Sequence, residues 1–357
     1  MRPEMIFGML DGYRPITNLL GAGDPNVHKI GEQWWMFFGG FQKSFKNNLF
    51  SASLPMGESL DSDAKWAITH EPGQPAQARP LIPQPSKQEW DGYGLHEPCY
   101  VEGRATNSQG VVVPCSRIYY TGRQSKSPLS NTSPFSIGFL EKGPNGWSRH
   151  PEPVVTGTDR NPNALGPKVV YADGKWRMWY RANQKEAVKG IRQQDEIYYI
   201  ESEDGINGWS EPLLFFSQQV SIAHAYVTKT SDGYEMLVST SPNLYGNPSY
   251  PDQKLWILKS DTPSGNREEW STDPEEVLDA RTGEPWYKGG FFGSSLCVPG
   301  LGQDEGARYV FFTGVHEPFH YLPYFLKRIL SFRKPPIPAP FYFSIGCFKR
   351  SSGVTRS

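Results

Sequence analysis

The feature that most constrains this chain is a seven-residue segment, rich in aromatic and β-branched residues, that occurs five times. The copies read WWMFFGG from Trp34, RIYYTGR from Arg117, WRMWYRA from Trp176, YEMLVST from Tyr234 and YVFFTGV from Tyr309. This composition favours β-strands, and seven residues are too few for an ordinary helix. Two of the copies follow Asp-Gly pairs, one directly and one after a single residue, and such pairs are typical of tight hairpin turns.

Each copy lies between two further strand-like segments, so the repeating unit contains at least three strands. A tryptophan follows four of the units and indicates a packing position: Trp66, Trp147, Trp209 and Trp270. Such small sheets cannot bury both faces alone, and they pack around a common axis as blades. The sequence therefore predicts an all-β, five-bladed β-propeller over residues 1–348, with blades starting near residues 24, 97, 166, 224 and 294.

The fifth unit contains an insertion at residues 317–340, and a polar tail follows at residues 349–357. The insertion is basic, aromatic and partly amphipathic, so residues 319–334 could lie on a membrane surface. Only about eleven of its residues are periodic, and we therefore favour a lid or a helix packed on the propeller.

The charge and the N-terminus limit the partners and the compartment. The 36 Lys and Arg residues nearly balance the 37 Asp and Glu residues, which argues against nucleic acid or a strongly anionic polymer as a partner. No apolar stretch is long enough for a transmembrane helix. The first residues lack the pattern of a secretion signal, and four cysteines make no disulfide framework, so a cytoplasmic protein is expected unless a leader is missing.

In a propeller, the first strand of each blade lines the central channel. The inferred ring of residues at one mouth of that channel is Asp24, Glu97, Gly166, His224 and Ser294. Two carboxyl groups from neighbouring blades are what glycoside hydrolysis requires, because one must be ionised and the other protonated. The alternatives are that Asp24-Pro25 and Glu97-Pro98 only open turns, and that His224 is a hydrogen-bonded channel residue and not a proton donor.

Further residues near this mouth are candidates for substrate binding. Asp159 and Arg160 could bring a charged pair to it, although a solvated loop pair is the simpler interpretation, and Lys168 follows Gly166 closely. Aromatic residues near blade starts or in loops could stack on sugar faces: Trp34, Trp35, Trp90, Trp286 and Tyr287.

The sequence shows no metal or cofactor motif. His316 to His320 match a zinc-protease pattern that requires a helix, but Pro318 lies in the middle of it, so neither a metal nor another cofactor is expected.

Three segments carry a family resemblance: GAGDPNVHKIGEQWWMFFGG from Gly21, GPKVVYADGKWRMWYRAN from Gly166 and SEDGINGW from Ser202. They resemble blades of the five-bladed β-propeller glycoside hydrolase superfamily, which includes families 43 and 32, and the resemblance spans residues 20 to 347. It implies that Asp24 is the catalytic base or nucleophile. That superfamily has an aspartate and a glutamate where this chain has Gly166 and His224, so the chain resembles a divergent member.

The resemblance implies a furanosidase-like glycoside hydrolase that cleaves a terminal or small sugar unit, with a carbohydrate as substrate. Glu97 is then the preferred acid and His224 the alternative. It also implies that a calcium ion could lie in the channel, although the sequence shows no ligand set for one. The rival hypotheses are a sugar-binding propeller whose catalytic residues have decayed, and a glycosyl-transferring enzyme that uses the same site.

Overall fold

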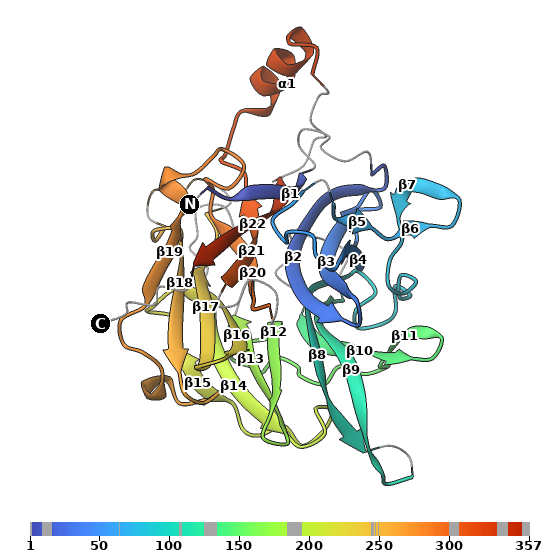
Figure 1. The fold of residues 1–357 in the computed structure, drawn as a ribbon, viewed down its shortest axis with the longest axis vertical. Coiled ribbons are helices and arrows are strands. Elements are labelled where there is room, and N and C mark those ends of the chain that lie inside the picture. The colour runs from blue at the N-terminus through green and yellow to red at the C-terminus, as the bar shows by residue number, and fades with distance from the viewer. Residues whose placement is uncertain are drawn as a thin grey trace.

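The computed structural model describes residues 2–8, 16–63, 65–106, 109–124, 134–183, 195–243, 246, 248, 250–299, 307–333 and 342–351. Its strands form five antiparallel blades arranged around an axis, which Figure 1 views approximately end-on, and a single parallel pairing between Asn47 and Gly94 joins the first two blades into one sheet. The prediction of an all-β, five-bladed propeller is confirmed.

The first three blades follow one another along the chain. Blade one contains β2 (Leu19–Ile30), β3 (Gln33–Gln42), β4 (Asn47–Pro55) and the short β5 (Ala67–Ile68). Blade two contains β8 (Gly94–Thr106), β9 (Val112–Arg123), β10 (Phe135–Gly143) and β11 (Gly146–Arg149). Blade three contains β12 (Asn163–Ala172), β13 (Lys175–Asn183), β14 (Asp195–Ser202) and β15 (Leu213–Phe216).

The last two blades complete the ring. Blade four contains β16 (Ile222–Thr230), β17 (Gly233–Thr240), β18 (Lys254–Ser260) and β19 (Glu275–Asp279). Blade five contains β20 (Phe291–Cys297), β21 (Ala307–Val315), β22 (Phe343–Ser351) and β1 (Glu4–Gly8). The remaining elements are the hairpin of β6 (His70–Glu71) and β7 (Gln74–Ala78), the 3-10 helices η1 (Arg267–Glu269) and η2 (Ala280–Thr282), and helix α1 (Tyr321–Leu330).

The N-terminal strand β1 is the outermost strand of the last blade. It pairs antiparallel with β22, so segments from opposite ends of the chain close the ring in one sheet. Ile6 and Phe7 of β1 are fully buried, and the Phe7 ring lies 5.7 Å from that of Phe38 in blade one. Sequence analysis assigned no strand before residue 24, because β1 lies outside the repeated unit.

The tryptophans that follow the blades are packing residues, as their repeat position indicates. Trp66 and Trp270 are buried, and each indole N–H donates to the carbonyl six residues earlier, that of Leu60 at 3.0 Å and that of Ser264 at 2.9 Å. Two blades therefore use the same side chain to fix the loop that precedes it. Trp147 and Trp209 are half-buried and pack against the hydrophobic core.

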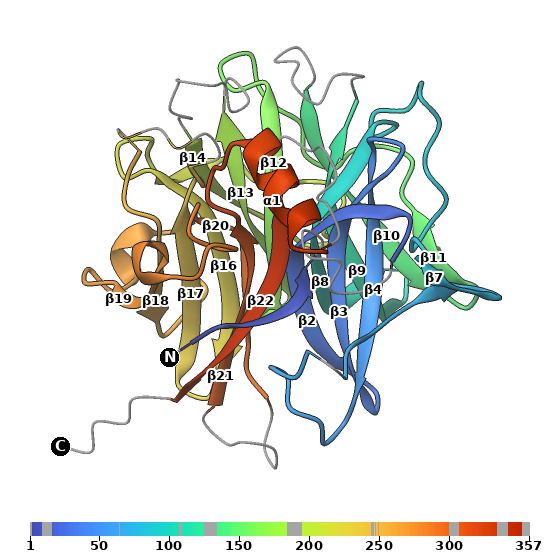
Figure 2. The ribbon, with the colours of Figure 1, turned by 90° about the horizontal axis from the view of Figure 1, so that it is seen from above.

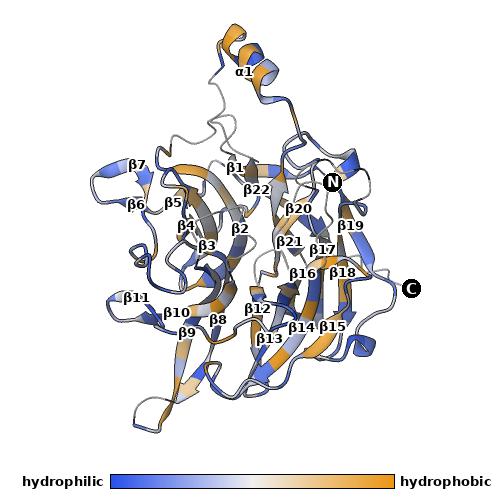
Figure 3. Cartoon of the chain, turned by 180° about the vertical axis from the view of Figure 1, so that it is seen from behind, coloured by the Kyte–Doolittle hydropathy of each residue, from blue (hydrophilic) through white to orange (hydrophobic). Residues whose placement is uncertain are grey.

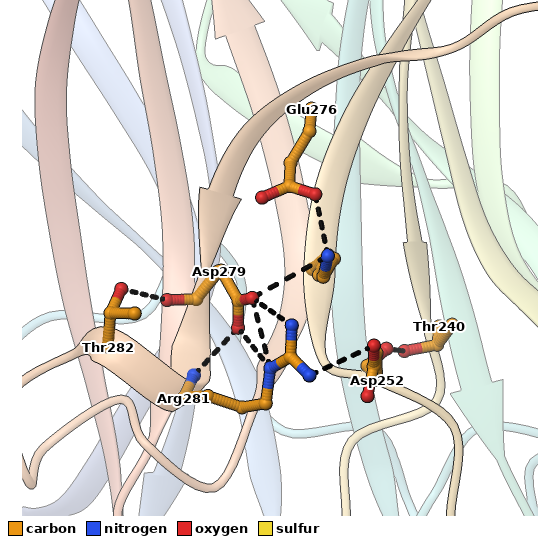
Figure 4. A network of polar contacts seen from close by, with 7 residues as sticks. Thr240, Asp252, Glu276, Asp279, Arg281 and Thr282 are labelled. Atoms are coloured by element: carbon orange, nitrogen blue, oxygen red, sulfur yellow. Dashed lines mark hydrogen bonds and ion pairs between the residues drawn. The ribbon is translucent and has the colours of Figure 1, made fainter.

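A polar network fixes the outer edge of blade four (Figure 4). Arg281 donates to both carboxylate oxygens of Asp279 and lies 3.2 Å from Asp252, while Lys254 pairs with Glu276 at 2.6 Å. Arg281 and Asp252 are more than half exposed, and solvent screens an ion pair in such a position strongly. The network therefore orients η2 and the end of β19 more than it stabilises the fold.

The insertion forms α1, but not as the favoured interpretation expected. Figure 1 shows the helix outside the ring of blades, and Figure 2, seen from above, shows it in front of them. Among the described residues, Tyr324 of the helix contacts His316 and Phe319 in the preceding link, and the helix does not lie over the axis as a lid. Residues 334–340 of the insertion and 352–357 of the tail lie outside the described residues. Among the described residues, no helix has the length and apolar composition needed to cross a membrane.

We expect Phe7→Ala to lower the free energy of unfolding by about 3–5 kcal/mol, because it opens a cavity where β1 closes the ring. Phe45→Ala is the matched control, since that phenylalanine is 62% exposed and its loss should change stability by about 0.5 kcal/mol or less. Chemical denaturation measures both variants. Equal effects would show that β1 does not hold the ring closed.

Candidate active site

Four of the five innermost strands contain the same irregularity. In each, two successive residues stand opposite one residue of the neighbouring strand, which is a β-bulge. The bulged pairs are Asp24-Pro25, Glu97-Pro98, Gly166-Pro167 and Gly293-Ser294. The first residue of each pair has a positive φ, of 56°, 54°, 63° and 49° respectively.

Asp24 and Glu97 are therefore held in a backbone conformation that normally favours glycine. Glycine does occupy the equivalent position in blades three and five. Holding another residue in this region costs on the order of 1–3 kcal/mol, and such strain clusters at functional sites. The strained pair of carboxylic residues on adjacent blades is thus a candidate active site.

The ring of axial residues inferred from the sequence needs one correction. In blade five, the bulge residue that matches Asp24 is Gly293 and not Ser294, a shift of one position. Blade four has a shorter bulge at Ala223, so that His224 pairs directly with Ser239. The repeat alignment assumed equal spacing in every blade and could not detect either difference.

The structure brings Asp24 and Glu97 into direct contact. The backbone N–H of Glu97 donates to Oδ2 of Asp24 at 3.3 Å, and the N–H of Asp24 donates to Oγ1 of Thr313 at 2.6 Å. Glu97 accepts from the Thr121 hydroxyl at 2.7 Å through Oε2 and from Arg181 at 3.2 Å through Oε1. Both oxygens of Glu97 are thus engaged, whereas Oδ1 of Asp24 has no partner among the described residues.

These contacts separate the protonation of the two carboxyl groups. Burial and the negative charge of Glu97 raise the pKa of Asp24 to about 7. Burial opposes ionisation of Glu97 as well, but the Arg181 guanidinium overcomes it and the pKa of Glu97 falls to about 2. The sequence had suggested Asp24 as the ionised base and Glu97 as the acid. The directions of these pKa shifts favour the opposite assignment, because the pKa of Glu97 is lowered and that of Asp24 is raised.

His224 lies beside this pair and is neutral. Burial lowers its pKa well below the usual range, and its ring meets Phe292 edge-on at 4.6 Å. Neither ring nitrogen has a hydrogen-bond partner among the described residues. Since neutral imidazole is a poor proton donor, this environment favours a binding role for His224 over the acid role considered from the sequence.

Several buried polar atoms at this end of the axis lack partners within the described part of the chain. They are Oδ1 of Asp24, both nitrogens of His224, and the hydroxyl oxygens of Ser239, Ser294 and Ser295. Buried polar groups are normally hydrogen-bonded, so each such atom needs an explanation. A cluster of unpaired donors and acceptors beside two carboxyl groups fits a site for a ligand rich in hydroxyl groups.

Lys168 lies two positions after Gly166 on β12 and is buried. Its Nζ is 5.9 Å from the ring of Tyr226, and its charge favours ionisation of both Asp24 and Glu97. A channel calcium ion does not fit this arrangement, because a lysine contributes positive charge there. The described residues also contain no group of three His, Cys, Asp or Glu side chains placed to hold a metal ion.

Three of the aromatic candidates are not placed to contact a ligand at this mouth. Trp34 and Tyr287 are buried in hydrophobic clusters, so their faces are not available to a sugar. Trp35 pairs with His28, beyond the bulge toward the opposite end of β2, and stacks on Phe37 at 6.5 Å.

Trp90 and Trp286 have a common packing role in blades two and five. Each indole covers two glycines on the second and third strands of its blade, where an added Cβ would come closer than 3.0 Å to the ring: Gly122 and Gly138 under Trp90, Gly314 and Gly346 under Trp286. These glycines exist to admit the indole, so the tryptophans complete the blades and do not present a face to a sugar.

The Asp159-Arg160 pair is exposed in the loop before β12, in agreement with the simpler interpretation. Arg160 pairs with Glu196 at 2.9 Å and not with its neighbour.

Sequence analysis missed the second-strand residues that pair with the residue next to each bulge. They occupy one position of the repeat, three residues after its central apolar residue: Gly39, Thr121, Arg181, Ser239 and Thr313. Thr121, Arg181 and Thr313 contact Glu97 or Asp24, and Gly39 leaves room for the Asp24 carboxyl. A polar residue or glycine at this position of an otherwise apolar segment was a signal that could have found them.

The comparisons with known proteins agree with this architecture. No family model matches the sequence, and no curated protein matches it. Among solved structures, a complex of BT0996 with RGII has a TM-score of 0.63 at 13% identity, over 99% of this protein and 95% of that one. The α-L-arabinofuranosidase from Lactobacillus brevis has a TM-score of 0.56 at 13% identity, over 92% and 91%.

A third similar structure is the catalytic domain of the Coprinopsis cinerea GH62 α-L-arabinofuranosidase. Its TM-score is 0.55 at 13% identity, over 98% of this protein and 96% of that domain. The class that the fold defines is therefore the five-bladed β-propeller found in glycoside hydrolases of families 43 and 62. At these identities the likeness establishes the fold, and the site must support the function.

The raised pKa of Asp24 predicts a pH dependence of stability. Between its ordinary pKa of 3.8 and about 7, the folded protein holds this proton more tightly than the unfolded chain, so stability falls as pH rises through that window. We expect Asp24→Asn to remove this slope and to be more stable than wild type above pH 7, by roughly 1.4 kcal/mol per pKa unit removed.

Chemical denaturation at a series of pH values measures this difference. Glu97, whose pKa is lowered, loses its stabilising contribution only as pH falls below its ordinary value of 4.5, so it does not produce a slope in the neutral range. If the free energy of unfolding changed with pH in the same way for wild type and Asp24→Asn, Asp24 would be ionised throughout this pH range.

Proposed function

We propose that this protein is a glycoside hydrolase with its active site at Asp24 and Glu97. The observation that supports this most is that two buried carboxyl groups interact electrostatically and have pKa values that differ widely, at about 7 for Asp24 and about 2 for Glu97, while the Asp24 carboxyl accepts the backbone N–H of Glu97. An acid and a carboxylate held side by side are what cleavage of a glycosidic bond requires. The shared fold of families 43 and 62 supports the same reaction class.

Asp24 is the proton donor in this proposal. It keeps its proton near neutral pH, and its Oδ1 has no competing partner among the described residues, so it can protonate the leaving-group oxygen. Glu97 is the ionised carboxylate, and its negative charge stabilises the positive charge that develops on the sugar ring. Arg181 and Thr121 fix the position of Glu97 and keep it ionised.

The substrate in this proposal is a terminal or small sugar unit, furanoside-like as the names of the neighbouring arabinofuranosidases suggest. The unpaired atoms of His224, Ser294 and Ser295 would hydrogen-bond to its hydroxyl groups.

The test is a screen of wild type against aryl furanosides and pyranosides, together with Asp24→Asn and Glu97→Gln. We expect each substitution to lower kcat/KM by about 10²–10⁴-fold. Asp173→Asn is the matched control, because Asp173 has a similar φ of 53° but is 76% exposed at a hairpin turn. Full activity of Asp24→Asn on every turned-over substrate would contradict the proposal.

The acid role of Asp24 gives a second expectation. Because Asp24 must be protonated, kcat/KM should fall as pH rises above about 7. Substrates whose phenolic leaving group needs no protonation should restore much of the activity of Asp24→Asn but not that of Glu97→Gln. If these substrates restored the activity of Glu97→Gln and not that of Asp24→Asn, Glu97 would be the proton donor and Asp24 the carboxylate.

A sugar-binding propeller without catalysis is the second candidate, and one observation favours it. Both oxygens of Glu97 are already occupied by Arg181 and Thr121, as in a structural ion pair. Calorimetry that detects sugar binding, combined with no turnover during long incubation, would establish this alternative. Product analysis with added acceptor sugars would reveal glycosyl transfer at the same site.

A further inference from the structure

Helix α1 presents an apolar stripe to solvent. Leu322, Leu326, Ile329 and Leu330 are 64%, 50%, 46% and 79% exposed. Their spacing of four, three and one residues places them on one face of the helix. Phe332, just after the helix, is 99% exposed. These five residues are called the α1 stripe below.

The opposite face of α1 is the one directed toward the rest of the protein. Tyr324 packs on Phe319, with ring centroids 4.3 Å apart, and Phe319 stacks on Tyr342 at 5.5 Å. Arg328 is buried on the same face as Tyr324, with its guanidinium 5.8 Å from that ring. In a globular protein the aliphatic stripe of an amphipathic helix normally faces the core. Here the aromatic and basic face does so, and the aliphatic residues point outward.

The segment that carries the α1 stripe contains basic residues and no acidic ones. From Pro318 to Arg333 the sequence contains no Asp or Glu, while Lys327 lies in the last turn and Arg333 follows the helix, both exposed. Figures 1 and 3 show the helix standing away from the blades, with hydrophobic residues along it. A flat surface could therefore approach the stripe without meeting the propeller.

We propose that the α1 stripe inserts into the surface of an anionic lipid bilayer. A short helix with exposed aliphatic residues, a terminal aromatic residue and flanking cations suits the boundary between acyl chains and negatively charged headgroups. A second copy of the chain fits less well. A helix of ten residues is only about 15 Å long, too small for the roughly 800 Å² per partner of a stable dimer.

Insertion of one short helix gives weak, reversible attachment that depends on charge. The candidate site lies on the innermost strands, whereas Figure 1 places α1 outside the ring, so attachment through α1 would not involve the residues of that site. This inference is independent of the proposed glycosidase activity.

The test is vesicle flotation of the full-length protein with phosphatidylcholine alone and with phosphatidylcholine containing phosphatidylserine. We expect flotation with the anionic vesicles, loss of it at high salt, and little with phosphatidylcholine alone. The double substitution Leu326→Glu with Ile329→Glu should lower the partition coefficient by about tenfold or more, since burial of each side chain is lost. Both side chains are exposed, so the fold should persist, and thermal unfolding checks this.

The matched control is Leu213→Glu with Leu214→Glu, which replaces two exposed leucines on β15 of blade three and should float like wild type. A tryptophan at the most exposed helical position, Leu330→Trp, should shift its emission to the blue and be quenched by brominated lipid only with anionic vesicles. Failure of wild type to float, or equal flotation of the α1 double variant, would overturn the proposal. Concentration-dependent dimerisation that the α1 double variant abolishes, without vesicle binding, would assign the stripe to a second copy and also overturn it.

Discussion

The β-bulge in the innermost strands is the constraint on which the candidate site depends. It gives the first bulged residue a positive φ and brings it against the next blade. An added Cβ at Gly293 would collide with the Asp24 carboxyl, and one at Gly166 would contact that of Glu97. Around the ring, two glycines thus flank two carboxylic residues. In blades three and five the positive-φ position is a glycine, which adopts this backbone conformation without strain. Because these glycines have no Cβ, they leave the space that the side chains of Asp24 and Glu97 occupy.

The electrostatics of the site follow from this close approach. Two buried carboxyl groups close enough to interact electrostatically cannot both ionise easily, and the positions of the cations influence which one does. Arg181 comes from β13 of blade three and contacts Glu97, while the Asp24 carboxyl accepts a backbone N–H from blade two. Arg181 therefore contributes to lowering the pKa of Glu97, while burial and the charge of Glu97 raise that of Asp24. The outcome depends on a residue in the second strand of a different blade.

The same propeller frame uses its aromatic residues mainly to hold the blades together. Trp90 and Trp286 each cover a pair of glycines, and Trp66 and Trp270 each fix a preceding loop. The aliphatic residues of α1 are the exception, because they are not used in the core at all. The tryptophans packed within the blades contribute to folding. The exposed aliphatic side chains of α1 do not, and they are suited to contact with an external surface.

The sequence by itself determined the fold class and indicated the candidate site. Five aromatic-rich repeats with hairpin turns leave few architectures other than a propeller, and Asp-Pro and Glu-Pro at matching repeat positions pointed to the innermost strands. The tertiary structure alone decided that β1 closes blade five, that Trp90 and Trp286 pack inside blades, and that the pKa of Asp24 is raised while that of Glu97 is lowered. The physical reason is the separation in sequence of the residues that interact. Repeat spacing and turn chemistry are local, whereas strand pairing across the ring, burial and the reach of Arg181 toward Glu97 join residues far apart in the chain.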